Sequence, residues 1–156
     1  MSFTCRTARP EETDDLSALC LRSKAHWGYD AAFMRDAEAA LTIDRAWVEG
    51  GEVIVAVNEA DRPVGLYRLL AEADRVIDLD LLFIDPSVIG RGVGRMLFER
   101  AAGEARRDGG RVLQILSDPN AADFYRRMGA VYRRDEPSDA IPGRFLPLFE
   151  LPLEAA

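Results

Sequence analysis

Three glycines spaced two residues apart, within residues 90–94, stand where the chain could bind an anion. They follow a mostly apolar run, residues 79–84, that has the length of a strand and is closed by Pro86, because proline cannot donate a ladder hydrogen bond. From Val93 onwards apolar residues recur every four positions, which predicts a helix that begins where the glycines end. The uncovered N–H groups of a helix N-terminus attract anions. The stretch therefore predicts an anion site, with a ligand-free strand-to-helix turn as the alternative.

Two aspartates on the same predicted strand could move protons. Asp78 and Asp80 are two residues apart, so their side chains share one face of that strand. Either carboxylate could therefore accept a proton from a substrate group as a general base. The alternative is that the pair belongs to an ordinary solvated strand face.

Two common glycine motifs do not fit this stretch. A Walker loop ends in Gly-Lys-Ser/Thr, whereas Gly94 is followed by Arg95 and Met96. A dinucleotide-binding fingerprint needs Gly-x-Gly-x-x-Gly directly after its strand, and here several loop residues intervene. The anion is therefore not predicted to be a nucleoside triphosphate or a dinucleotide.

Residues 89–94 instead resemble the acetyl-CoA pyrophosphate loop of the GNAT superfamily of N-acetyltransferases, whose pattern is Gln/Arg-x-x-Gly-x-Gly/Ala after a bulged strand. Both required glycines match, and Ile89 replaces the polar first residue. Residues 118–130 resemble a second pattern of the family, Asn-x-x-Ala-x-x-Phe/Leu-Tyr-x-x-x-Gly-Phe. Its alanine, Phe-Tyr pair and glycine are in register, while Asp118 replaces the asparagine and Ala130 the last aromatic residue.

The predicted elements have the order β-α-α-β-β-β-α-β-α-β-β and form one domain, residues 1–156. That order predicts an α/β fold with a mixed sheet, parallel around helical crossovers and antiparallel in hairpins. Its similarity to the GNAT fold implies a centrally splayed β-sheet flanked by helices. One helix is predicted over about residues 31–41. The last strand is predicted over residues 144–153, and Pro147 and Pro152 indicate that it is an edge strand or an irregular one.

The resemblance implies a role for each matching position. The phenol of Tyr125 corresponds to the proton donor for the departing CoA thiolate, with a core-facing structural tyrosine as the alternative. Asp78, slightly ahead of Asp80, stands where such enzymes carry a base. Coenzyme contacts, including backbone N–H groups of a bulge that could hold the oxyanion, are expected at Leu82, Phe83, Ile84, Ile89, Gly90, Arg91, Gly92, Val93, Gly94, Arg95, Asn120 and Tyr125.

Four further residues are candidates for the acceptor pocket. His26, Trp27 and Tyr29 fall where a helix pair borders that pocket in similar enzymes, and the aromatic faces could receive a cation. A lone histidine beside a tryptophan is more often structural than catalytic. Arg144, in a late loop, could instead hold a carboxylate or a phosphate.

Composition limits the class of protein. The 156 residues carry a net charge of −7, which argues against nucleic acid as a partner, although residues 91–111 carry six arginines against three acids. The sparse cysteines, Cys5 and Cys20, have no metal-ligand spacing and indicate reduced thiols. The early acidic residues and the lack of a long apolar run predict neither a targeting segment nor a membrane span. We therefore expect a cytoplasmic protein.

The sequence thus predicts an N-acetyltransferase that uses acetyl-CoA as co-substrate and no metal. The acceptor is expected to be a primary amine of a small molecule or a peptide, attacked directly on the thioester, and the fold alone does not say which amine. No nucleic acid or membrane partner is expected, and homodimer formation is left open. A non-catalytic acyl-CoA-binding module is the alternative.

Overall fold

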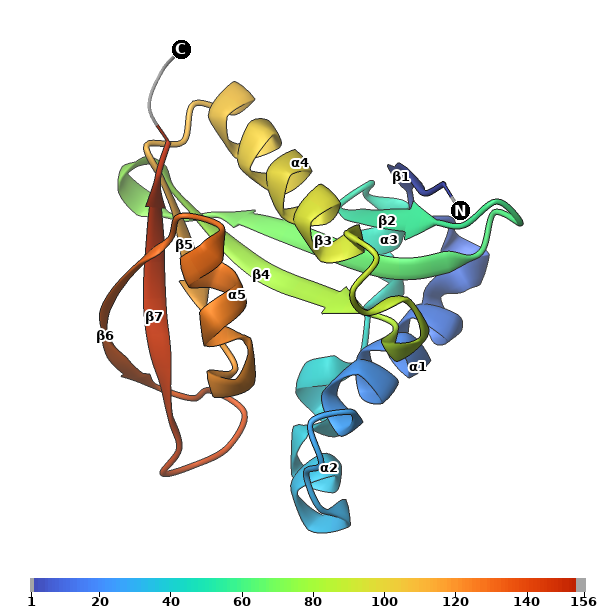
Figure 1. The fold of residues 1–156 in the computed structure, drawn as a ribbon, viewed down its shortest axis with the longest axis horizontal. Coiled ribbons are helices and arrows are strands. Elements are labelled where there is room, and N and C mark those ends of the chain that lie inside the picture. The colour runs from blue at the N-terminus through green and yellow to red at the C-terminus, as the bar shows by residue number, and fades with distance from the viewer. Residues whose placement is uncertain (1, 154–156) are drawn as a thin grey trace. The chain divides into compact units, whose positions relative to one another are not determined.

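The computed structural model describes residues 2–153, which form a mixed α/β structure (Figure 1). Its strands hydrogen-bond in the order β1-β2-β3-β4-β5-β7-β6. The strands are β1 Thr4–Thr7, β2 Val53–Val57, β3 Pro63–Ala71, β4 Val76–Ile84, β5 Val112–Leu116, β6 Val131–Pro137 and β7 Phe145–Pro152. The α-helices are α1 Thr13–Ala25, α2 Ala31–Ala37, α3 Arg45–Glu49, α4 Val93–Arg107 and α5 Ala122–Arg127. The predicted fold class is confirmed.

Two helical details differ from the prediction. Helix α2 ends at Ala37, and a 3₁₀ turn, Glu38–Leu41, replaces its expected last turn. The short helix α3 was not predicted, because five residues are too few to show a helical period. Its one local signal is Asp44, whose carboxylate accepts a hydrogen bond from the N–H of Ala46 at 2.8 Å as an N-cap.

The last strand was predicted to be an edge strand or an irregular one, and of these the edge position is wrong. Strand β7 lies between β5 and β6 and pairs antiparallel with both. Pro147 lies one residue beyond the last register pair of β7 with β5, Leu116–Leu148, where a missing N–H donor disrupts that ladder least. Its carbonyl still accepts a hydrogen bond from the N–H of Ser117 at 2.9 Å, and Pro152 is the last residue of the strand. The edge strand on this side of the sheet is β6, most of whose residues are exposed.

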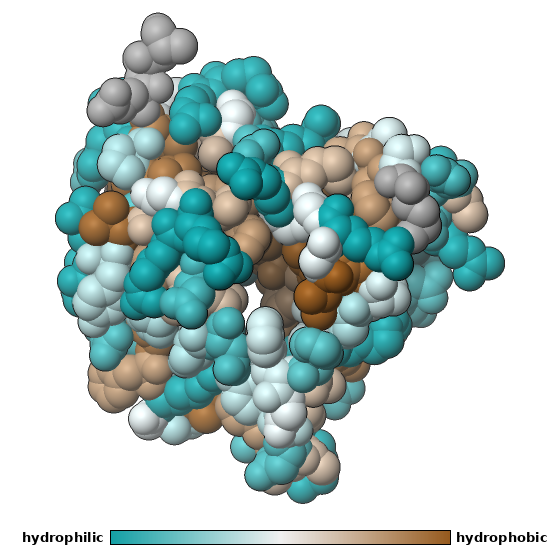
Figure 2. Space-filling view, in the orientation of Figure 1, coloured by the Kyte–Doolittle hydropathy of each residue, from teal (hydrophilic) through white to brown (hydrophobic). Residues whose placement is uncertain are grey.

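The chain divides into two compact units, which we describe separately. Unit 1 comprises Met1–Arg68 and Leu81–Leu97, and unit 2 comprises Leu69–Asp80 and Phe98–Ala156. Strands β3 and β4 and helix α4 contribute residues to both units. The face seen in Figure 2 is mainly hydrophilic with smaller hydrophobic patches, in keeping with a chain that is 30% charged.

The core of unit 1 forms around β2, whose five residues are all buried. Strand β2 pairs antiparallel with β1 and with β3, so it contacts a strand on each side. Helix α1 adds an apolar face in which Leu16, Leu19 and Cys20 are buried. Cys5 and Cys20 do not form a disulfide bond with each other.

Strands β4 and β5 of unit 2 pair in parallel through Val76–Val112, Ile77–Leu113 and Asp78–Gln114. Strand β5 continues as an antiparallel partner of β7. Helix α5 lies beside β7 (Figure 1).

Candidate active site

The glycine loop of unit 1 has the backbone that an anion site requires. Gly90 and Gly92 have φ angles of +83° and +82°, a region that side chains with a Cβ rarely adopt. No heavy atom lies within 4 Å of the place where either Cβ would stand, so the space beside the backbone is open. Helix α4 begins at Val93, and the N–H of Met96 already bonds to the carbonyl of Gly92 at 3.0 Å.

Side chains near the loop leave its backbone accessible. Arg91 and Arg95 are exposed, and Ile89, which replaces the polar residue of the family pattern, is 51% exposed. Leu82, Phe83 and Ile84, the predicted oxyanion and coenzyme contacts, are partly exposed at the end of β4. The loop therefore combines an open helix N-terminus with local positive charge.

Asp85 fixes the start of this loop, a role that the sequence analysis did not assign. Its N–H donates to the carbonyl of Val64 at 2.8 Å, and its carboxylate accepts from Arg22 Nη2 at 2.7 Å and from the N–H of Ser87 at 3.0 Å. Burial raises the pKa of Asp85, but these donors outweigh it and hold the pKa below its usual value. The Asp85-Pro86 pair was the available signal, since Asp is a common cap and Pro a common first residue of a helical turn.

Gly65 on β3 lets the first turns of α4 lie directly on the sheet of unit 1. A Cβ at this position would be 2.8 Å from Leu97 Cδ1 and 3.3 Å from Val93 Cγ1. It would also be 3.2 Å from the carbonyl oxygen of Phe83. The lack of a side chain at Gly65 thus permits the close approach of helix α4 to strand β3.

Asp78 of unit 2 is a half-buried carboxylate with a hydrogen bond from the next strand. Gln114 Nε2 donates to Asp78 Oδ1 at 3.4 Å. Burial, opposed by the hydrogen bond from Gln114 and helped by the negative charges of Asp80, Glu72 and Asp139, raises the pKa of Asp78 to about 6. A base works best when its pKa lies near the pH of the reaction, so Asp78 suits that role at neutral pH. Asp80 is also half-buried on the same strand face.

Tyr125 has features of both roles considered for it, a structural tyrosine of the core and a proton donor. Its ring packs in an aromatic cluster with Phe98, Phe124 and Phe149, at centroid distances of 5.9, 5.2 and 6.3 Å. The residue is only 6% exposed, so its ring belongs to the core of unit 2. Burial, helped by the charge of Asp118, raises the pKa of the phenol well above its usual value, so it carries its proton at neutral pH.

Asp118 organises the start of the α5 region in unit 2. Its carboxylate accepts from the N–H and from Nδ2 of Asn120, at 2.8 and 3.0 Å. Arg144 Nη2 lies 3.6 Å from the same carboxylate. Both Asn120 and Arg144 therefore hold the Asp118 cap in this structure, and their roles toward coenzyme and acceptor stay predictions.

The three predicted acceptor residues of unit 1 lie at the end of α1. The rings of His26 and Trp27 meet edge to face at 5.6 Å, and Trp27 is 44% exposed. Tyr29 stacks on Phe33 at 4.0 Å and has the ammonium of Lys24 5.3 Å from its ring centroid. The ring of Tyr29 thus already receives a cation from its own chain, whereas Trp27 offers exposed aromatic surface.

Two kinds of feature do not occur in residues 2–153. No cluster of three or more His, Cys, Asp or Glu side chains could hold a metal ion. No helix in these residues is both long enough and apolar enough to span a bilayer.

Comparison with known proteins decides the family. A family model described as an acetyltransferase (GNAT) domain matches residues 20–139, which is most of the chain. The chain belongs to the GNAT acetyltransferase family. The resemblance seen in the two sequence motifs is confirmed, and so is the predicted enzyme class, an acetyl-CoA-dependent N-acyltransferase.

Relatives of this GNAT protein match it over nearly its whole length. Peptidyl-lysine N-acetyltransferase YjaB of Escherichia coli strain K12 is 34% identical over 156 residues, covering 97% of each chain. The protein of the same name from Salmonella typhimurium strain LT2 is 32% identical, covering 97% of this chain and 98% of its own. The solution structure of apo YjaB from Escherichia coli covers both chains fully, with a TM-score of 0.70 and 30% identity. A GCN5-related N-acetyltransferase from Rhodopseudomonas palustris has a TM-score of 0.79 at 22% identity, covering 98% and 97%.

Proposed function

We propose that this GNAT enzyme transfers the acetyl group of acetyl-CoA to the ε-amine of a lysine in a peptide or protein. The relatives that match it from end to end are named peptidyl-lysine N-acetyltransferases, which supports this acceptor over a small molecule. The observation that carries the proposal is Asp78, a half-buried carboxylate with a pKa raised to about 6. The carboxylates of Asp80, Glu72 and Asp139 act on it, so the surroundings are negative and favour an ammonium group.

The proposed chemistry is direct attack with two proton transfers. Asp78 accepts a proton from the lysine ammonium, and the neutral amine attacks the thioester carbonyl carbon. As the C–N bond forms and the C–S bond breaks, Tyr125 donates its phenol proton to the departing thiolate, which gives free CoA. The second proton on the lysine nitrogen leaves and restores the phenol. One acetylated lysine, one CoA thiol and one released proton result.

The glycine loop is proposed to bind the coenzyme through its pyrophosphate. The N–H groups of residues 90–93 stand at an open helix N-terminus, and no Cβ shields Gly90 or Gly92. Arg91 and Arg95 add positive charge beside that backbone. Since the required contacts come from the backbone, the exposed Ile89 does not prevent them.

We infer a cytoplasmic location from the composition. The non-catalytic acyl-CoA-binding module is disfavoured, because the relatives that match the whole chain are named as enzymes.

The direct test is acetyl transfer to defined acceptors. The enzyme is incubated with acetyl-CoA and a peptide that contains one internal lysine and a blocked N-terminus, and free thiol is measured together with the mass and position of the added acetyl group. The matched control peptide carries arginine in place of lysine. We expect thiol release and one acetyl group on lysine Nζ, and none with the control. Coenzyme binding without thiol release, for this peptide and for a panel of small amines, would contradict the proposal and favour the binding module.

A further inference from the structure

We propose that Gln114 is a positioning residue that holds the carboxylate of Asp78 in the orientation needed for proton transfer. Gln114 was absent from the residues that the sequence pointed to, and no family motif includes it. The inference rests on the proposed function, because Gln114 acts only on Asp78, the base proposed there. Its signal in the sequence was a single amide side chain inside an otherwise apolar strand, β5.

The backbone places the two side chains together at a defined point of the sheet. Asp78 and Gln114 are partners in the parallel register of β4 and β5, so their side chains project from the same face. Theirs is also the last of the three pairs between these two strands. The strand ladder therefore fixes both Cα positions.

Only one orientation of the Gln114 side-chain amide is compatible with a hydrogen bond to the ionised carboxylate of Asp78. An ionised carboxylate can only accept hydrogen bonds, so Gln114 must turn its NH₂ group, and not its carbonyl, toward Asp78. In the structure, Gln114 Nε2 donates to Asp78 Oδ1 at 3.4 Å. That hydrogen bond favours the ionised carboxylate, which is the form that accepts a proton from the acceptor amine.

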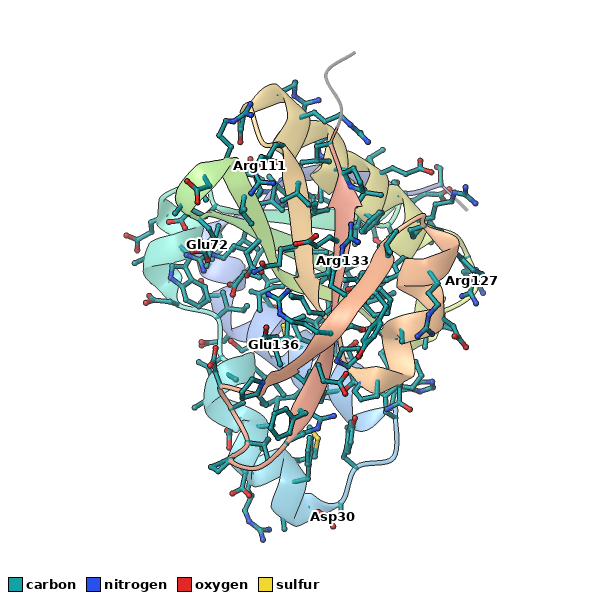
Figure 3. All side chains as sticks on the ribbon, turned by 90° about the vertical axis from the view of Figure 1, so that its left-hand side faces the viewer. Asp30, Glu72, Arg111, Arg127, Arg133 and Glu136 are labelled. Carbon is teal, nitrogen blue, oxygen red and sulfur yellow. The ribbon has the colours of Figure 1, made fainter. Side chains whose placement is uncertain are left out.

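A second carboxylate lies on the other side of Gln114 in the same row of the sheet. In the antiparallel register of β5 with β7, Gln114 is opposite Glu150. Arg133 Nε, on β6, binds Glu150 Oε1 at 2.9 Å, and Figure 3 shows Arg133 on that strand. Because Glu150 has this arginine as its own partner, the row pairs Arg133 with Glu150 and Gln114 with Asp78.

The charged groups around Asp78 explain why the amide matters. Asp80 comes from β4 itself, Glu72 follows the end of β3, and Asp139 lies in the loop between β6 and β7, while Glu150 of β7 is paired with Arg133. Burial and these carboxylates raise the pKa of Asp78, and the hydrogen bond from Gln114 opposes them. Without that hydrogen bond, a larger fraction of Asp78 is protonated at neutral pH and cannot serve as a base.

The test is a carboxyl titration that does not depend on activity. The pKa of Asp78 is measured by carbon NMR in the full chain, with the signal assigned by its loss in Asp78→Asn. In Gln114→Met, which keeps the length and removes the donor, the pKa should rise by about 0.5 to 1 unit, the size expected of a long hydrogen bond to a charged acceptor. In the isosteric Gln114→Glu the rise should be larger, because a like charge replaces the donor. A merely structural role of Gln114 does not predict that the pKa of Asp78 rises more in Gln114→Glu than in Gln114→Met.

Kinetics then separates the inference from the function on which it rests. The acid limb of the pH–rate profile should move upward with the pKa of Asp78 in Gln114→Met, and Gln114→Met should add no further change in an Asp78→Asn background. An Asp78 pKa within about 0.2 unit of wild type in both variants would overturn the inference, since the hydrogen bond is expected to shift it more. If Gln114→Met does not fold, the titration of Gln114→Glu decides alone. A moved pKa with an unmoved pH–rate profile would support the contact but overturn the positioning role, and it would show that Asp78 is not the base.

Discussion

Replacing Asp78 by asparagine should make the protein more stable at neutral pH while it lowers activity. The pKa of Asp78 is about 6 in the folded protein against an ordinary value of 3.8, so folding favours the neutral acid. The stability that this gives is fully present below pH 3.8 and is lost as the pH rises through about 6. At pH 7 the ionised carboxylate therefore costs stability, and a neutral asparagine, which can still accept from Gln114, does not.

The size of this effect follows from the two pKa values. Their difference corresponds to ~3 kcal/mol if the carboxylate were fully shielded from water. Asp78 is only half-buried, so solvent screening reduces the figure, and we expect roughly half of it, ~1.5 kcal/mol. For a chain of this length, that corresponds to a rise in Tm of roughly 3 to 6 °C.

Urea unfolding of wild type and Asp78→Asn at pH 7 and at pH 4 measures the effect. The free energy of unfolding should be larger for the variant at pH 7, and the advantage should shrink toward zero at pH 4, where most of Asp78 is protonated in the folded state. The control is Asp36→Asn on the exposed surface of α2, which should change stability by only a few tenths of a kcal/mol at either pH. An Asp78→Asn protein no more stable than wild type at pH 7 would refute this account of the buried carboxylate.

Three further substitutions test the coenzyme loop, the acid and the packing of α4. Gly92→Val should lower CoA affinity on the order of tenfold or more by calorimetry, because φ there is +82° and a side chain would cover the N–H groups. Gly28→Val, at φ +88° with equally open surroundings, should leave the affinity unchanged, and equal affinities in both variants would remove the loop from the coenzyme site. Tyr125→Phe should lower turnover on the order of 10²-fold with unchanged CoA affinity; turnover within about threefold of wild type would leave only the structural role in the aromatic cluster. Gly65→Ala should cost ~1–3 kcal/mol in thermal unfolding, since its Cβ would stand 2.8 Å from Leu97 Cδ1, whereas Gly103→Ala within α4 should add up to ~1 kcal/mol. Equal stabilities of these two variants would contradict the packing of α4 on β3.

Features that depend on neighbouring residues were predictable from the sequence. Helix α4 begins at Val93, as the recurrence of apolar residues every four positions indicated, and Gly90 and Gly92 just before it have positive φ angles that regular helices and strands do not contain. The shared face of Asp78 and Asp80 follows from the two-residue period of a strand. These signals are local, so a single sequence contains them.

Features that depend on distant pairing were not predictable. Gln114 meets Asp78 only because β4 and β5 pair in one particular parallel register, and nothing in either strand encodes that register alone. Arg22 of helix α1 and Asp85 are also far apart in the sequence, so their ion pair was not predictable either. An edge position was one prediction for β7, because proline usually avoids central strands, but Pro147 lies just beyond the last pair of β7 with β5, which the sequence of β7 alone does not show.

The pH dependence of acetyl transfer to a lysine peptide tests the central claim most directly. kcat/KM is measured from pH 5 to 9 with acetyl-CoA for wild type and Asp78→Asn. The account predicts that wild-type kcat/KM falls about tenfold per pH unit below a pKa of about 6, which is that of Asp78. In Asp78→Asn the change of slope near pH 6 in the pH profile of kcat/KM should vanish. The rate near pH 7 should fall on the order of 10²-fold and recover as the pH rises. Transfer with the same change of slope and the same rate in both proteins would contradict the claim that Asp78 deprotonates the acceptor.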